Sequence, residues 1–245
     1  MDKLTVIVTG ASSGIGQVIA EAYLERGARV VVCARRIAKL QDIYGSYSKA
    51  EIYKVDVSDA LEIKNLVQGV EQKFSGIDVL LNNAAVLSSG KVEDMDPSDW
   101  SMAYRVNVEA PFLFCKYVLP GMKARNFGRI INMSSGGSVA CGPEYSLYSS
   151  TKAALNAFTK ALGRELEGSN VKANAMSPGP CKTDMFPDNP LSPDAAVPTA
   201  VYLATLKDGG PNGQFFWMER EVQIIPDFSH VNWADPNSAL EKEIA

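Results

Sequence analysis

The chain has 245 residues, of which 46% are hydrophobic and 21% are charged, and its formal net charge is -4. This composition is typical of a globular protein and excludes collagen-like, low-complexity and disordered classes. The charge is small and forms no long run of one sign, so we do not expect a nucleic acid partner. The sequence contains no apolar run near the roughly 18 residues that span a bilayer and no signal-peptide profile. We therefore expect a cytoplasmic protein.

Strand-length apolar runs alternate with longer segments at helical spacing. The expected strands cover residues 4–9, 29–34, 50–56, 78–82, 128–134 and 171–177. The expected helices cover residues 15–26, a segment opened by the cap candidate Ser58, and residues 98–123, 148–167 and 194–205. Strands separated by helices need crossover connections, which produce a mostly parallel sheet covered on both faces. We predict a doubly wound α/β fold with one domain over residues 1–225 and a C-terminal tail over residues 226–245.

The first expected strand runs into a glycine-rich turn, residues 9–16, which leads directly into a helix. A pyrophosphate needs close backbone approach and the free N–H groups of a helix N-terminus, and glycine allows both. A glycine trio alone is more often a tight turn, but the strand, turn and helix context favours a dinucleotide site. The turn contributes these candidate cofactor contacts: Gly10, Ser12, Ser13, Gly14, Ile15 and Gly16.

The second expected strand ends in Arg35 and Arg36, where an NAD-binding fold commonly has an acidic residue. Because arginine can pair with a 2′-phosphate and no carboxylate repels it here, NADP is favoured over NAD. Solvated charges at a helix start are the alternative. Asp56 and Val57, at the end of the third strand, are further candidate contacts. Asp56 could accept a hydrogen bond from an adenine amino group, or it could cap the following turn.

The four cysteines form no C-x-x-C pair, and the single histidine, His230, lies near the C-terminus. This distribution offers little material for a Ser-His-Asp hydrolase, and we expect no metal site. The cysteines are therefore expected to be reduced thiols.

Further motifs follow in order, and together they resemble the short-chain dehydrogenase/reductase family from Leu4 to about Gln214. The segment after the fourth strand, NNAA at residues 82–85, is similar to the family's Asn-Asn-Ala-Gly, with Ala85 in place of glycine. The resemblance implies a Rossmann-type, seven-stranded sheet and cofactor contacts from Asn83 and Ala84. It also implies a catalytic tetrad: Asn107, Ser135, Tyr148 and Lys152.

Tyr148 and Lys152 are four positions apart on an expected helix, so both side chains lie on one face. A phenol titrates near ~10, so proton transfer near neutrality requires a lower pKa, and a nearby ammonium favours phenolate. Tyr145 has serine four positions later and lacks this arrangement. The resemblance implies that Lys152 also bonds the nicotinamide ribose and that Asn107 holds a water linking the lysine to solvent.

Ser134 and Ser135 are neighbours, and strand alternation would send them to opposite faces. The family's interval between serine and tyrosine selects Ser135, whose hydroxyl would orient and polarise a carbonyl oxygen. Ser134 is expected to be structural.

The loop after the sixth strand resembles the family's Pro-Gly loop, which implies nicotinamide contacts from Pro178, Gly179 and Thr183. Only residues 184–193 separate this loop from the next helix, a shorter lid than many relatives have. We expect Met185, Phe186 and the tail around residues 228–233 to complete the substrate contacts.

These observations predict an NADP(H)-dependent oxidoreductase that interconverts a small carbonyl compound and its alcohol, with Tyr148 as general acid and base. The alternatives are a 3-oxoacyl or polyol oxidoreductase, or a catalytically silent NADP-sensing protein. The intact tetrad argues against the silent sensor. We expect a homodimer or homotetramer through helix 98–123 and the catalytic helix. Phe112, Phe114 and Tyr117 could form that apolar face, but core packing explains them almost as well.

Overall fold

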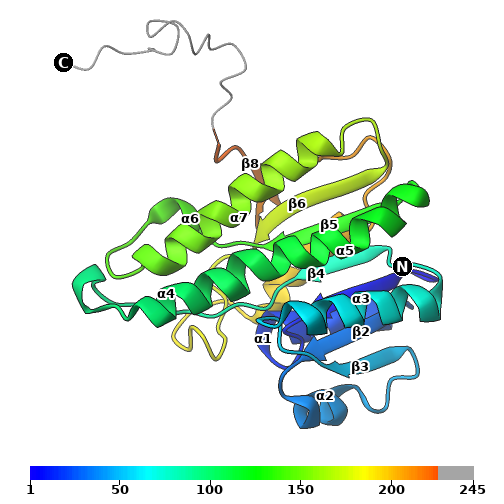
Figure 1. Cartoon of the computed structure of the whole chain (residues 1–245), viewed down its shortest axis with the longest axis horizontal. Coiled ribbons are helices and arrows are strands. Elements are labelled where there is room, and N and C mark those ends of the chain that lie inside the picture. The colour runs from blue at the N-terminus through cyan, green and yellow to red at the C-terminus, as the bar shows by residue number, and fades with distance from the viewer. Residues whose placement is uncertain (226–245) are drawn as a thin grey trace, which may run out of the picture.

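The computed structural model describes residues 1–225, so the expected tail and His230 lie outside the described residues. Its centre is an eight-stranded sheet in the order β3-β2-β1-β4-β5-β6-β7-β8, with helices on both faces (Figure 1). The pairings from β3 through β7 are parallel, and β8 is antiparallel to β7. The strands are β1 (Thr5–Thr9), β2 (Arg29–Ala34), β3 (Ala50–Lys54), β4 (Val79–Asn82), β5 (Gly128–Met133), β6 (Val171–Ser177), β7 (Phe215–Trp217) and β8 (Arg220–Val222).

The helices that connect successive parallel strands lie on both faces of the sheet. The α-helices are α1 (Gly14–Glu25), α2 (Ile37–Tyr44), α3 (Ala60–Phe74), α4 (Pro97–Tyr104), α5 (Ala110–Ala124), α6 (Gly137–Ala140), α7 (Ser146–Glu165) and α8 (Val197–Ala204). Helices α1, α2 and α8 lie on one face and α3, α5 and α7 on the other, which confirms the doubly wound α/β class. Short 3-10 turns cover Val92–Asp94 and Pro193–Ala196, and a π-helical turn covers Arg105–Glu109.

Two expectations about element number and boundaries are wrong. The sheet has eight strands instead of seven, because the chain turns back after β7 at Met218, whose φ is +52°, and adds the short antiparallel strand β8. Helix α3 is capped by Asp59 instead of Ser58. The Asp59 carboxylate accepts hydrogen bonds from the backbone N–H groups of Leu61 (2.7 Å) and Glu62 (3.2 Å). A carboxylate is a strong N-cap acceptor and also favours the positive end of the helix dipole.

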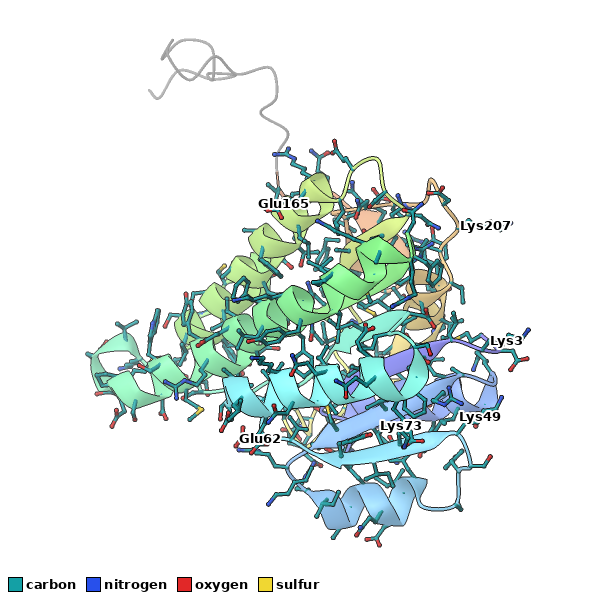
Figure 2. All side chains as sticks on the ribbon, turned by 45° about the vertical axis from the view of Figure 1, so that its right-hand side comes forward. Lys3, Lys49, Glu62, Lys73, Glu165 and Lys207 are labelled. Atoms are coloured by element: carbon teal, nitrogen blue, oxygen red, sulfur yellow. The ribbon has the colours of Figure 1, made fainter. Side chains whose placement is uncertain are left out.

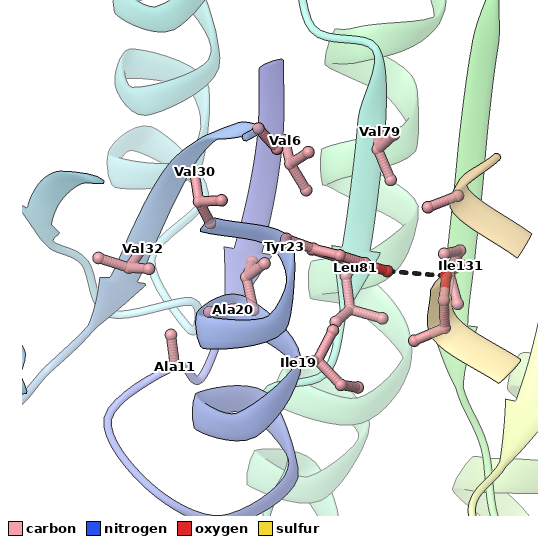
Figure 3. Close-up of a cluster of buried hydrophobic side chains, with 14 of the residues drawn as sticks. Val6, Ala11, Ile19, Ala20, Tyr23, Val30, Val32, Val79, Leu81 and Ile131 are labelled. Atoms are coloured by element: carbon pink, nitrogen blue, oxygen red, sulfur yellow. Dashed lines mark hydrogen bonds between the residues drawn. The ribbon is translucent and has the colours of Figure 1, made fainter. Parts of the chain in front are cut away.

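The apolar core is divided by the sheet into two clusters. One contains side chains of α1, α2 and α8 against one face, and the other contains side chains of α3, α5 and α7 against the opposite face. Tyr23 of α1 is fully buried in the first cluster, and its hydroxyl donates a 2.9 Å hydrogen bond to the backbone carbonyl of Ala200 in α8 (Figure 3). Lys3 and Lys207, by contrast, project at the periphery of the molecule (Figure 2).

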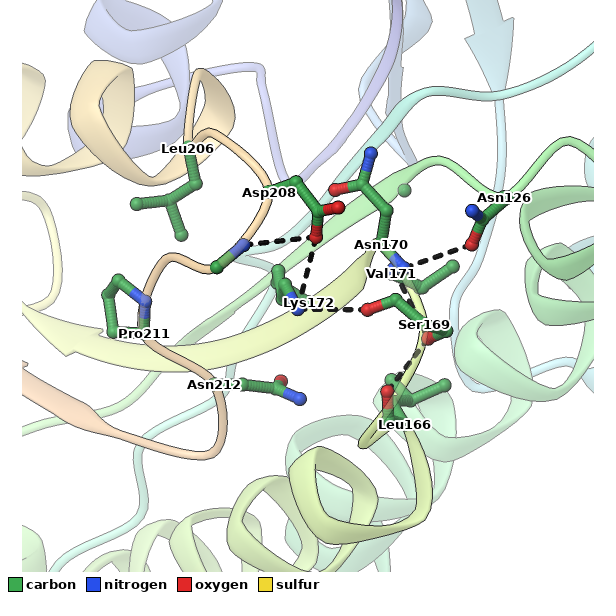
Figure 4. A network of polar contacts seen from close by, with 12 residues as sticks. Asn126, Leu166, Ser169, Asn170, Val171, Lys172, Leu206, Asp208, Pro211 and Asn212 are labelled. Carbon is green, nitrogen blue, oxygen red and sulfur yellow. Dashed lines mark hydrogen bonds and ion pairs between the residues drawn. The ribbon is translucent and has the colours of Figure 1, made fainter.

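Polar contacts hold the amino ends of β5 and β6 together. Arg129 is buried, and its guanidinium donates to the carbonyl oxygens of Asn170 (2.6 Å) and Leu206 (2.9 Å). Nearby, the Lys172 ammonium donates to the Ser169 carbonyl (2.8 Å) and lies 3.9 Å from the Asp208 carboxylate (Figure 4). This end of the sheet is therefore fixed, and the opposite end carries the cleft described below.

None of the helices within residues 1–225 has the combined length and apolarity needed to cross a membrane. The same residues contain no cluster of histidine, cysteine or acidic side chains arranged to hold a metal ion.

The hydroxyl of Tyr23 gives a direct test of the first core cluster. Tyr23→Phe should lower the free energy of unfolding by about 1 kcal/mol, because it removes a buried hydrogen bond and leaves the ring in place. Tyr202→Phe is the matched control, since Tyr202 is 50% exposed and should change stability by less than about 0.5 kcal/mol. Urea unfolding of both variants provides the measurement, and equal effects would contradict the assigned role.

Candidate active site

One cleft of about 960 Å³ lies along the carboxyl ends of the parallel strands, where the strand order reverses between β1 and β4. Such a switch point is the usual ligand site of an open α/β sheet. The cleft brings together every predicted site residue except Asn107, which is buried behind its wall. The predicted residues that line it are Gly10, Ser12, Ser13, Gly14, Ile15, Gly16, Arg35, Arg36, Asp56, Val57, Asn83, Ala84, Ser135, Tyr148, Lys152, Pro178, Gly179 and Thr183.

The glycine turn fits a pyrophosphate. Gly10 and Gly14 have φ values of +68° and +57°, which side-chain-bearing residues rarely adopt. A Cβ atom on Gly16 would lie 2.4 Å from the Asn83 amide nitrogen, so the turn also requires glycine there. Helix α1 begins at Gly14 with no side-chain cap and no acidic residue in its first turn. Its N–H groups and positive dipole end are therefore available to an anion.

Thr9 and Asn83 hold this turn in place across the switch point. The Thr9 hydroxyl accepts hydrogen bonds from the backbone N–H groups of Asn83 (2.9 Å) and Ala84 (3.0 Å). The Asn83 side-chain amide donates to the carbonyl oxygens of Thr9 (3.0 Å) and Gly10 (3.3 Å). Asn83 thus braces the turn as well as lining the cleft. Ala85 is not among the residues with positive φ, so alanine fits where the family has glycine.

Arg36 connects the end of β2 to the glycine turn. Its Nη2 atom donates to the hydroxyls of Ser12 (2.9 Å) and Ser13 (2.7 Å), and its Nη1 atom lies 3.9 Å from the Asp184 carboxylate. Arg35 is exposed at the cleft edge. The guanidinium groups therefore differ in environment, because Arg36 is engaged by the turn and Arg35 lies beside it.

Asp56 caps the turn that follows β3, which is one of its two predicted roles. Its Oδ1 atom accepts hydrogen bonds from the backbone N–H (2.9 Å) and the hydroxyl (2.7 Å) of Ser58. The hydrogen bond from the Ser58 backbone lowers the pKa of the Asp56 carboxyl, and the charge of Arg35 lowers it further. The carboxylate is thus ionised at neutral pH and faces the same cleft.

Tyr148 and Lys152 share the buried face of α7, as their spacing predicts. The Lys152 ammonium lies 5.7 Å from the centre of the Tyr148 ring and donates a 2.8 Å hydrogen bond to the Met133 carbonyl. Burial raises the pKa of the Tyr148 hydroxyl, and a hydrogen bond with Ser135 opposes this rise. Burial also lowers the pKa of Lys152 to about 8. The expectation that the lysine depresses the tyrosine pKa is therefore not met in the protein alone, because desolvation disfavours both charged forms.

Asn107 lies in the π-helical turn Arg105–Glu109 between α4 and α5. Its side-chain amide donates to the Val86 carbonyl (2.9 Å) and the Thr151 hydroxyl (3.1 Å) and accepts from the Val86 N–H (2.9 Å). Asn107 therefore joins the segment after β4 to α7 beside Lys152. Single π turns inside helices often occur at functional sites.

The two serines differ from the simple alternation that was expected. Strand β5 ends at Met133, so alternation no longer governs the next two residues, and both Ser134 and Ser135 line the cleft. The Ser135 hydroxyl accepts a 3.1 Å hydrogen bond from the Gly137 N–H. The Ser134 hydroxyl is buried, and within residues 1–225 it has no hydrogen-bond partner.

Sequence reasoning missed a brace between the serine loop and the catalytic helix. The Ser138 hydroxyl donates a 2.6 Å hydrogen bond to the Ser135 carbonyl and accepts a 2.8 Å bond from the Asn156 amide. Asn156 lies four positions beyond Lys152 on the same helix face, and this spacing is the signal that could have identified it.

The remaining wall of the cleft is more apolar. Thr183 lies against the glycine turn, where its Cγ2 atom would be 3.2 Å from a Cβ on Gly14. Met185 and Phe186 line the cleft as expected, and the Phe186 ring meets the Tyr148 ring edge-on with centroids 6.2 Å apart. Trp217, at the end of β7, was missed because its partners are distant in sequence. The predicted contacts at residues 228–233 lie outside the described residues.

Comparisons with known proteins point to one family. The model of the family described as short chain dehydrogenase matches residues 4–192. An uncharacterized oxidoreductase of Staphylococcus aureus is 34% identical over 180 residues, which cover 73% of this chain and 78% of the relative. A short chain dehydrogenase of Pseudocercospora fijiensis is 36% identical over 203 residues, which cover 80% of this chain and 64% of the relative.

Solved structures agree with this match. A variant of actinorhodin polyketide ketoreductase with NADPH is 28% identical, has a TM-score of 0.81, and covers 87% of this chain and 95% of its own. The closed form of a serine dehydrogenase complexed with NADP+ has a TM-score of 0.82 at 24% identity, covering 88% and 94% of the two chains. At that identity the second likeness concerns the fold alone.

The lowered pKa of Lys152 predicts a pH-dependent stability. Because the folded pKa of about 8 lies below the ordinary lysine value of 10.5, the unfolded chain binds more protons between these pH values. Stability from this group therefore increases with pH in that window. The difference in unfolding free energy between the wild type and Lys152→Met should rise by roughly 2 to 3 kcal/mol from pH 7 to pH 10.

Chemical denaturation at several pH values measures this difference. The control is Lys160→Met, which changes a half-exposed lysine two turns further along α7 and should show no comparable trend. A flat pH profile for the Lys152 difference would show that this ammonium is not destabilised by burial.

Proposed function

Because the chain belongs to the short chain dehydrogenase family of oxidoreductases, we propose that it is an NADP(H)-dependent enzyme that interconverts a carbonyl compound and its alcohol. The family supports the coarser statement that it acts on CH–OH or C=O groups. The observation that carries the finer proposal is the single cleft that holds the glycine turn, two arginines and the Ser135, Tyr148 and Lys152 side chains.

The glycine turn and the end of β2 would hold the coenzyme. The uncapped start of α1 suits a pyrophosphate, and Arg35 and Arg36 suit a 2′-phosphate, since no acidic residue occupies the end of β2. Arg36 is already bonded to the turn through Ser12 and Ser13, which leaves Arg35 as the residue that distinguishes NADPH from NADH. The ketoreductase relative with NADPH supports this choice.

Tyr148 would act as the proton donor in carbonyl reduction. Because burial raises its pKa, the hydroxyl is protonated at neutral pH and can transfer its proton to the carbonyl oxygen. Reduced coenzyme held by the glycine turn and the arginines would supply the hydride for the carbonyl carbon. The Ser135 hydroxyl, next to Tyr148, would orient the same oxygen.

Lys152 and Asn107 would hold Tyr148 and its helix in position. A lysine with a pKa of about 8 can hold or release a proton near neutrality, and its hydrogen bond to Met133 fixes it beside the Tyr148 ring. Asn107 fastens the neighbouring turn of α7 through Thr151. We include in this proposal a water molecule that Asn107 would hold and that would link Lys152 to solvent.

We also propose a homodimer or homotetramer formed through α5 and α7. Phe112 of α5 is 46% exposed and meets Phe158 of α7 edge-on, at 6.2 Å between ring centroids. Phe114 is buried and Tyr117 packs against the second core cluster, so of the three predicted residues Phe112 is the one suited to an interface.

The proton-donor role predicts the effect of removing one hydroxyl. Tyr148→Phe should lower kcat/KM for carbonyl reduction by at least about 10²-fold, the usual contribution of a general acid, and leave NADPH affinity within about twofold. Tyr202→Phe, away from the cleft, is the control. Steady-state kinetics and NADPH fluorescence titration test both statements, and a Tyr148→Phe enzyme with most of its activity would overturn the assignment.

Coenzyme choice predicts a difference between the two arginines. Arg35→Ala should weaken NADPH binding by about 1 to 3 kcal/mol, about 5- to 150-fold, and leave NADH binding nearly unchanged. Arg36→Ala should weaken both coenzymes, because it also releases the hydroxyls of the glycine turn. Lys39→Ala, an exposed charge on α2 outside the cleft, controls for surface charge. Equal losses of both coenzymes in Arg35→Ala would show that Arg35 does not read the 2′-phosphate.

A further inference from the structure

Trp217 occupies a special position beside the proposed catalytic serine. It ends β7, where it pairs with Ser177 of β6, and its side chain lines the cleft. Its six-membered ring lies against Gly136, the neighbour of Ser135, because a Cβ atom on Gly136 would be only 2.1 Å from Cζ3 and 2.4 Å from Cη2. Any side chain at Gly136 would therefore displace the indole. Trp217 is 37% exposed, so part of its aromatic surface remains accessible.

The next glycine, Gly137, lies close to both the Ser135 hydroxyl and a second aromatic ring. A Cβ atom on Gly137 would lie 3.4 Å from the Ser135 hydroxyl oxygen and 3.6 Å from the Tyr148 ring. Phe186 then packs edge-on against Tyr148, and its side chain also lines the cleft. The loop that carries Ser135 therefore has two aromatic neighbours that line the cleft: the indole of Trp217 lies against Gly136, and the phenol of Tyr148 lies near Gly137.

Charged side chains are distributed unevenly along the same cleft. Arg35, Arg36 and Asp56 lie at the glycine-turn end, and Asp184 faces Arg36 at 3.9 Å. At the Ser135 end, Lys152 is the one charged lining residue that the described part of the chain provides, and it is buried and bonded to the Met133 carbonyl. A carboxylate or phosphate on a substrate would lose hydration there, and among the described residues its one cationic neighbour would be the buried Lys152, whose ammonium is already bonded to Met133.

We propose that Trp217 is a specificity-determining residue that selects uncharged carbonyl compounds with an aromatic ring next to the carbonyl group. This inference rests on the proposed function and adds the substrate class. With the carbonyl oxygen at Ser135 and Tyr148, the adjoining ring packs on the exposed part of the indole. Aromatic pairs are more favourable than the apolar area they bury would indicate, so a flat ring is preferred over a saturated ring of the same size.

Three ketones of graded chemistry test this proposal. They are an aryl methyl ketone, the cyclohexyl methyl ketone of matched size, and the aryl ketone bearing a para carboxylate. The wild-type enzyme with NADPH should show kcat/KM about tenfold higher for the aryl than for the cyclohexyl ketone. The carboxylated ketone should be at least about 10²-fold poorer than the aryl ketone.

Two substitutions of Trp217 separate aromatic contact from apolar bulk. Trp217→Phe keeps an aromatic ring and should retain the preference for the aryl ketone within about threefold. Trp217→Leu keeps a large apolar side chain and should abolish that preference, mainly through a higher KM for the aryl ketone, while NADPH affinity stays within about twofold. The control is Trp100→Phe, since Trp100 stacks on Tyr104 and does not line the cleft.

The outcomes separate failure of this inference from failure of the proposed function. If Trp217→Leu still prefers the aryl ketone, or if the carboxylated ketone is reduced as well as the aryl ketone, the inference is overturned. If the wild type reduces no ketone with NADPH or NADH, the proposed function fails for these compounds. The dissociation constant of the aryl ketone, from ligand-observed NMR on the wild type and Trp217→Leu, then decides the role of Trp217: a rise of about tenfold supports it, and equal values overturn it.

Discussion

The site depends on the hydrogen bonds that join the carboxyl ends of β1 and β4. The Thr9 hydroxyl accepts hydrogen bonds from the backbone N–H groups of Asn83 and Ala84. The Asn83 side-chain amide donates two hydrogen bonds to carbonyl oxygens of Thr9 and Gly10. These bonds join segments that are more than 70 residues apart in the sequence. The strand order reverses at this point, so the crossovers on its two sides leave in opposite directions and open a cleft. Because the strands are parallel, every loop that carries site chemistry emerges at the same edge of the sheet.

Burial on one helix face then sets the chemistry of Tyr148 and Lys152. Desolvation disfavours the charged form of each, so the tyrosine pKa rises while the lysine pKa falls to about 8. The two pKa values therefore move apart, and attraction between the two groups causes neither shift. The same burial fixes their positions, because Lys152 is held by Met133 and the serine loop is held to α7 through Asn156.

The fold and the placement of Tyr148 and Lys152 on one helix face could be predicted because their signals are local, whereas the choice of Asn107 and Ser135 rested on the family resemblance. Periodicity located six strands and the principal helices, and the four-residue spacing placed Tyr148 and Lys152 on one face. Strand β8 gave no such signal, since its Arg-Glu-Val segment is exposed and pairs only because the chain reverses at Met218. The contact between Trp217 and Gly136 could not be predicted either, because it joins segments 81 positions apart and neither residue is unusual by itself.

Charged side chains are distributed unevenly along the cleft, so substitutions at one end can leave the other end unaffected. Arg35, Arg36, Asp56 and Asp184 lie at the glycine-turn end, whereas the Ser135 end is lined by Trp217, Tyr148 and two glycines and, among the described residues, by one charged group, the buried Lys152. An exposed charge interacts weakly beyond about 10 Å at moderate salt, so a substitution at the β2 end has little electrostatic effect on a distant apolar wall. The proposed selectivity for a charged coenzyme and the proposed selectivity for an uncharged substrate can therefore vary separately on this scaffold. The proposals assign the first to the ends of β2 and β3 and the second to Trp217 at the end of β7.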